Sequence, residues 1–102
     1  MIEITYWDYG WGGEITADGH AEGGAYGEDV ICAGVSALMQ TLCLRLRGRA
    51  GCRTEMAPGR ARIGFLRRGR AAQDVEFMLC GLRWIAETYP DNVHMQEKRG
   101  AG

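Results

Sequence analysis

The chain has 102 residues, of which 46% are hydrophobic and 25% charged, and its net charge at pH 7 is -1. These values are typical of one globular domain that folds without crosslinks. No apolar run approaches the roughly 18 residues that span a bilayer, and the net charge argues against a dedicated nucleic-acid-binding protein. We expect one domain over residues 1–97, a disordered tail over 98–102, and neither a membrane nor nucleic acid as a partner.

The N-terminal residues predict a β-hairpin. Ile2, Ile4 and Tyr6 alternate with polar residues, which is typical of a strand with one buried face and unlike the basic start and apolar centre of a secretory signal. Residues 10–13 predict the turn, and residues 14–17 predict the second strand. We therefore expect a cytoplasmic protein.

A long amphipathic helix is predicted to follow. Asp29 is suited to cap its N-terminus, and Cys32 falls at about the third helical position, at the edge of the apolar stripe. We expect a cysteine at that edge to lie half-buried in a cleft beside the core. The stripe consists of Ile31, Val35, Leu38, Leu42 and Leu46.

The second half repeats the order of the first. Strands are predicted at about 52–56 and 60–66 around a turn at Pro58 and Gly59, then a helix over 71–88 and a possible short strand over 92–96. The predicted fold class is α+β, with a small, mostly antiparallel sheet, two helices packed against it, and the order β-β-α-β-β-α with a possible C-terminal strand.

The four cysteines do not form a C-x-x-C motif, which argues against a zinc ribbon or a thioredoxin-type site. Cys43 and Cys80 lie in helical apolar patterns, so we expect both to be buried hydrophobes. Cys52 lies in a short polar segment that predicts no environment for it. We expect no metal and no cofactor.

Charge is distributed unevenly along the chain. Residues 1–44 contain seven acidic residues and no Lys or Arg, whereas residues 45–70 contain nine arginines against the single acid Glu55. If the acids formed one face, that face would attract basic partners. The arginines indicate either nucleic acid or a solvated hairpin paired with acids elsewhere; we favour the hairpin because Phe65 is the only aromatic residue among them.

The stretch between His20 and Cys32 places a base, a glycine-containing loop and a thiol in succession. Helix N-termini and nearby imidazoles both favour the thiolate form of a cysteine, and free helical N–H groups can bind an oxyanion. Spacing alone leaves a core cysteine and a solvated loop histidine as the alternative. It also leaves open whether Asp29 contacts His20 or only caps the helix, and His94 is interpreted as structural or solvent-exposed.

The residues themselves resemble a known family. Gly19-His20-Ala21, followed by Tyr26-Gly27-Glu28-Asp29-Val30-Ile31-Cys32-Ala33-Gly34-Val35-Ser36, is similar to the signature of the ribosomal-processing cysteine protease family Prp, in which a G-H-A motif and an acidic D-(I/V)-(V/I)-C-A-(A/G)-x-S motif flank a glycine-containing loop.

The resemblance implies a cysteine endopeptidase, a hydrolase that removes a short N-terminal extension from a basic large-subunit ribosomal protein. It implies catalytic roles for His20 and Cys32, supporting roles for Asp29 and Ser36, a small α+β homodimer, and no metal or organic cofactor. It also implies a loop that closes over the substrate, containing Gly23, Gly24, Tyr26 and Gly27.

Two alternatives remain beside this interpretation. Some relatives process phage proteins, so a phage structural protein is a second possible substrate. A non-catalytic module that docks a ribosomal or phage protein without cutting it would use the same surface.

Overall fold

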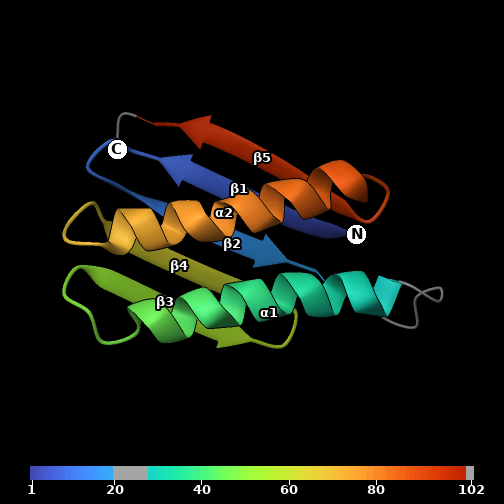
Figure 1. Ribbon diagram of the computed structural model, residues 1–102, viewed down its shortest axis with the longest axis horizontal. Coiled ribbons are helices and arrows are strands. Elements are labelled where there is room, and N and C mark those ends of the chain that lie inside the picture. The colour runs from blue at the N-terminus through green and yellow to red at the C-terminus, as the bar shows by residue number, and fades with distance from the viewer. Residues whose placement is uncertain (20–27, 101–102) are drawn as a thin grey trace.

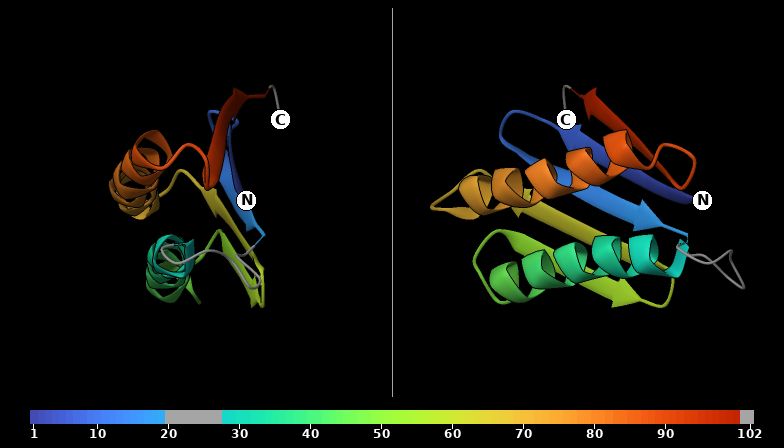
Figure 2. Two further views of the ribbon diagram at one scale, coloured as in Figure 1. Left: turned by 90° about the vertical axis from the view of Figure 1, so that its right-hand side faces the viewer. Right: turned by 45° about the vertical axis from the view of Figure 1, so that its right-hand side comes forward.

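Two helices cover one face of a five-stranded sheet in the computed structural model, which describes residues 1–19 and 28–100 (Figures 1 and 2). The elements in chain order are β1 (Ile2–Asp8), β2 (Gly12–Asp18), α1 (Glu28–Leu46), β3 (Cys52–Ala57), β4 (Arg60–Leu66), α2 (Ala71–Thr88) and β5 (Val93–Arg99). The predicted α+β class and element order are confirmed.

The strands lie in the order β3-β4-β2-β1-β5. All neighbours are antiparallel except β1 and β5, which run parallel, with Ile2 opposite Val93. The last strand is longer than the predicted 92–96, because β5 continues to Arg99. The prediction of a disordered tail from residue 98 is therefore wrong for Lys98 and Arg99, which lie in a strand.

The core lies between the sheet and the helices. Alternation in β1 turns Ile2, Ile4 and Tyr6 toward the helices, as predicted, and Ile15 of β2 continues this apolar face. The helices contribute buried stripes at three- and four-residue steps. These residues are Val35, Met39, Leu42 and Leu46 of α1 and Val75, Met78, Leu79, Leu82 and Ile85 of α2. Of the residues predicted for the α1 stripe, Ile31 and Leu38 are only partly buried.

The opposite face of the sheet carries no helix (Figure 2), and most of the strand side chains on it are polar or charged. Arg60 pairs with Asp18 at 3.0 Å across neighbouring strands, and Arg62 lies 3.7 Å from Glu14. The prediction that the arginine hairpin pairs with acids elsewhere is thus confirmed for these two residues. Exposed pairs of this kind contribute little to stability individually.

The acids of the N-terminal third do not form the acidic face considered from the sequence, as far as the described side chains show. Glu3, Asp8, Glu14 and Asp18 each lie within 4 Å of a basic side chain. The sequence did not indicate this pairing, because the basic partners lie far along the chain, in β4, β5 and the loop after β4.

The predicted burial of cysteines is right for Cys43 and wrong for Cys80. Cys43 faces the core, whereas Cys80 faces solvent on the outer side of α2. Cys80 is one residue past the buried Leu79, about 100° around the helix, which turns it out of the stripe. Cys52 is half-buried, and all four cysteines are free.

Within residues 1–19 and 28–100, no helix combines the length and the apolarity that crossing a bilayer requires.

Candidate active site

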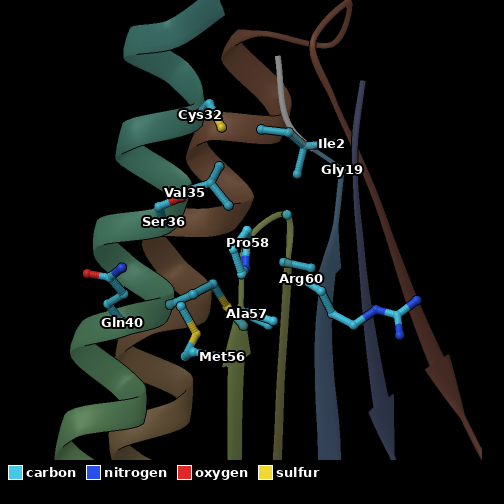
Figure 3. Close-up of a pocket in the computed structure, with 14 residues that line it drawn as sticks. Ile2, Gly19, Cys32, Val35, Ser36, Gln40, Met56, Ala57, Pro58 and Arg60 are labelled. Atoms are coloured by element: carbon cyan, nitrogen blue, oxygen red, sulfur yellow. The ribbon is translucent and has the colours of Figure 1, made fainter. Parts of the chain in front are cut away.

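A cavity of about 410 Å³ opens between the first half of α1 and the turn that joins β3 to β4 (Figure 3). The N-terminus of β1 and the end of β2 complete its walls. Its lining consists of Ile2, Ala17, Gly19, Cys32, Val35, Ser36, Met39, Gln40, Met56, Ala57, Pro58, Gly59, Arg60 and Ala61. Most of these side chains are apolar, so the cavity suits an apolar group carried by a polar backbone.

Cys32 is half-buried on the α1 wall, as the sequence predicted. Ser36 and Gln40 follow it at four-residue steps along the same wall, because residues four apart share one face of a helix. In Figure 3 the sulfur of Cys32 points from α1 toward the side where Ile2 and Gly19 lie. A thiol, a hydroxyl and an amide thus line one side of the cavity in order.

The helix begins earlier than predicted. It starts at Glu28, so Asp29 is its second residue rather than its cap, and Cys32 is the fifth residue rather than about the third. The N–H of a fifth residue already donates within the helix and is not free for an oxyanion. Because side chains tilt toward the helix N-terminus, the thiol still points back toward the first turn, whose N–H groups have no partner within the helix.

Several predicted site residues lie outside the described residues. These are His20, Gly23, Gly24, Tyr26 and Gly27, together with the side chain of Asp29. Of the predicted set, the structure brings together Cys32 and Ser36.

Gly19 connects this cavity to the undescribed segment. Its N–H donates to the carbonyl of Gly59 at 2.9 Å, and its φ of +101° is one that glycine tolerates best. A Cβ there would lie 2.5 Å from the carbonyl oxygen of Met1, so no larger residue fits. Gly19 lines the cavity, and His20 is bonded directly to it; the chain therefore leaves the described part at the cavity rim.

Sequence reasoning missed the second wall of the cavity. Residues 56–60 were assigned as a strand end and a turn without a functional role, yet all of them line the cavity. Gln40 was also missed, although its four-residue spacing from Ser36 was available as a signal. In the described part of the chain, His, Cys, Asp and Glu side chains do not gather in groups of three that could hold a metal ion.

The family model described as "Cysteine protease Prp" matches residues 1–94, nearly the whole chain. The chain belongs to the cysteine protease Prp family. The protein is therefore a hydrolase, and the predicted recognition and enzyme class are confirmed.

Individual Prp proteins are similar over their full length. The Ribosomal processing cysteine protease Prp of Staphylococcus aureus is 29% identical, with 95% of this chain and 97% of that protein covered. Two crystal structures of the S. aureus protease, one with a covalently linked product peptide and one with a substrate peptide, give TM-scores of 0.77 and 0.79 at 26% and 25% identity. Each covers 96% of this chain and 100% of the other.

The thiols of this Prp-family chain should differ sharply in alkylation rate. We expect iodoacetamide to modify Cys32 at least about tenfold faster than Cys80, although Cys80 is the exposed one. Burial raises the pKa of the Cys43 and Cys52 thiols, which leaves less thiolate at neutral pH and slows both. Peptide mass mapping after timed quenching measures all four rates. A Cys32 rate no higher than that of Cys80 would contradict an activated thiol.

Proposed function

We propose that Cys32 is the nucleophile of this protease and that His20 is its base. His20 takes the thiol proton of Cys32, and the resulting thiolate attacks the scissile carbonyl. The tetrahedral intermediate collapses as the protonated His20 gives that proton to the leaving amine. His20 then takes a proton from water, whose oxygen attacks the thioester. The acid fragment leaves, and Cys32 is regenerated.

One observation carries this assignment: the half-buried thiol of Cys32 faces a cavity whose rim is Gly19, the residue bonded to His20. The assignment of this pair rests on more than its twelve-residue spacing, because Gly19, the residue before His20, lines the same cavity as the thiol of Cys32. Ser36, one turn beyond Cys32, is proposed to support the site by hydrogen bonding to the bound peptide.

The proposed substrate is the N-terminal extension of a basic large-subunit ribosomal protein. Support comes from the similar S. aureus protein, whose name gives ribosomal processing as its task. The apolar lining, which includes Val35, Met39 and Met56, suits an extension with a bulky apolar side chain beside the cleaved bond. Maturation of ribosomes also places the enzyme in the cytoplasm, where free thiols persist.

Residues 20–29 are proposed to complete the site around the peptide. Gly23, Gly24 and Gly27 supply backbone freedom for a loop that closes over the substrate, and Tyr26 supplies a large contact surface. Asp29 is proposed to orient His20 or to stabilise the start of α1.

A cleavage assay tests this function. The extended ribosomal protein of the source organism is incubated with the wild type and with Cys32→Ala, and both are analysed by intact-mass spectrometry. Loss of one defined N-terminal peptide with the wild type alone is the expected result. Cleavage only of a phage structural protein would reassign the substrate, and tight binding with no mass change in either incubation would favour a docking module.

We also infer that the protein forms a homodimer through the outer face of α2. Phe77 is 77% exposed and Trp84 is 59% exposed, and both lie on one side of the helix with Cys80 between them. Exposed apolar stripes of this kind typically mark protein–protein contacts.

Phe77→Glu is expected to convert the dimer into a monomer in light scattering after size exclusion, because it places a charge in the proposed contact. Leu44→Glu, at an exposed apolar site on α1 beside β3, introduces the same charge away from the outer face of α2 and should leave the dimer intact. A monomeric wild type, or a Phe77→Glu variant that stays dimeric, would contradict this interface.

A further inference from the structure

The end of the molecule opposite the Cys32 cavity combines stacked aromatic rings with exposed arginines. The β1–β2 turn, the α1–β3 loop, the β4–α2 loop and the end of β5 all lie at this end, on the left in Figure 1. The cavity lies toward the other end of a molecule 40 Å long, near the start of α1. A ligand at the arginine-rich end would therefore leave the cavity free.

Three aromatic rings form a continuous stack at this end. Trp7 and Tyr9 have ring centroids 6.0 Å apart with planes 10° from parallel, and Tyr9 and Trp11 are 5.2 Å apart at 14°. The ammonium group of Lys98 lies 5.1 Å from the Trp7 centroid. Trp11 ends the stack and is 54% exposed, so a further planar ring can be added to it.

The turn that carries Trp11 is held rigidly by Arg67. The backbone N–H of Arg67 donates to the carbonyl of Trp11 at 2.9 Å, and its guanidinium donates to the carbonyl of Gly10 at 2.9 Å. The same guanidinium lies 3.4 Å from Asp8, whose carboxylate accepts the N–H of Gly10. The turn is thus already ordered before a ligand binds, which lowers the conformational entropy lost on binding.

Further basic side chains lie at the same end of the molecule as the stack. Register places Lys98, Trp7, Glu14, Gly64 and Arg53 in one row across the open face of the sheet. Glu14 is the acid in that row, and Arg62 pairs with it. Five exposed arginines at this end form no ion pair within the described part of the chain: Arg47, Arg53, Arg68, Arg70 and Arg99.

We propose that this aromatic and arginine surface binds single-stranded RNA, with a base stacked on Trp11 and phosphates held by the unpaired arginines. Stacking rings beside a basic surface are the two features that single-stranded nucleic acid requires. An apolar peptide would leave the arginines without partners, and an acidic peptide would leave the ring stack unused. The choice of RNA over DNA rests on the proposed ribosomal substrate, because an enzyme acting there meets ribosomal RNA.

This proposal reverses the expectation drawn from the sequence. The sequence argues against nucleic acid, because the net charge is -1 and Phe65 is the only aromatic residue among the arginines of 45–70. The pairing of β2 with β4 brings Trp11, at the end of the ring stack, beside Arg67 in the arginine-rich segment. Phe65 itself is buried in the core.

Fluorescence anisotropy of a labelled single-stranded RNA of about twelve nucleotides, within the usual range of binding-site sizes, tests the proposal. The protein carries Cys32→Ala, so the result does not depend on proteolysis. Trp11→Leu should weaken binding about tenfold or more, while Trp11→Tyr, which retains a ring, should bind nearly as the wild type. Arg68→Gln with Arg70→Gln should reduce the slope of log affinity against log salt by about 1.4, whereas Arg62→Gln should not change it.

The same assay identifies the results that overturn the proposal. Equal affinity for duplex RNA or heparin, or unchanged binding by Trp11→Leu, would mean that stacking is not involved. Tighter binding of single-stranded DNA would exclude RNA as the preferred ligand. Failure to bind RNA in low salt would contradict the proposed RNA-binding surface. It would not affect the proposed protease function, which is tested separately by peptide cleavage. In the catalytically active protein, unchanged peptide cleavage by Trp11→Leu is expected and shows that the variant is folded.

Discussion

Replacing Cys32 with alanine should lower the rate of peptide cleavage by at least about 1,000-fold, because no other described side chain on the cavity wall is a strong nucleophile. His20→Ala should cause a loss of similar order, since the two groups act as a unit. Initial rates with a peptide spanning the processing site measure both effects, and circular dichroism checks that the fold is retained.

His94→Ala is the matched control for His20→Ala. His94 is exposed and lies 2.8 Å from Glu3 on the open face of the sheet, away from the helices. Its replacement should leave the cleavage rate within about twofold of the wild type, as for most exposed positions. Equal losses in the two histidine variants would mean that His20 has no special role.

The second large effect concerns stability. Leu79 of α2 is 0% exposed and lies in the core beneath the helices. Leu79→Ala should lower the free energy of unfolding by about 2–5 kcal/mol through lost burial and the cavity left behind. For a domain of this size that is a large share of the total.

Leu44→Ala is the matched control for Leu79→Ala, because Leu44 of α1 is 64% exposed. The same chemical change there should alter stability by less than about 0.5 kcal/mol. Urea titration at constant m-value gives both numbers. Similar losses of stability at the two positions would contradict the burial of Leu79 between the helices and the sheet.

The predictions from sequence succeeded where the signal was local. Alternation in residues 2–6 and the recurrence of Val35, Leu42 and Leu46 at three- and four-residue steps indicate which faces are buried, and the structure has both. Cys80 was assigned from its apolar neighbours instead of its angular position, and this was the avoidable error. The spacing from Leu79 already turned it away from the core.

Long-range pairings could not be predicted in the same way. Nothing in the segment 93–99 indicates that it lies parallel to β1, about ninety residues earlier, because strand partners are chosen by the assembled core and the crossover through α2. The cavity wall formed by residues 56–60 and the contact between Trp11 and Arg67 likewise depend on segments that are distant in sequence and meet only in the folded protein. The motif identified the thiol, and the fold supplied its cavity.

The most direct test of the central claim is to trap the reaction on the enzyme. Wild-type protein is mixed with a peptide that spans the processing site, quenched in acid at short times, digested and analysed by mass spectrometry. We predict a thioester between the N-terminal fragment of the peptide and Cys32, which forms and decays in step with cleavage and is absent in Cys32→Ala. Cleavage that proceeds with the fragment attached to another cysteine, or with Cys32→Ala as active as the wild type, would contradict the account.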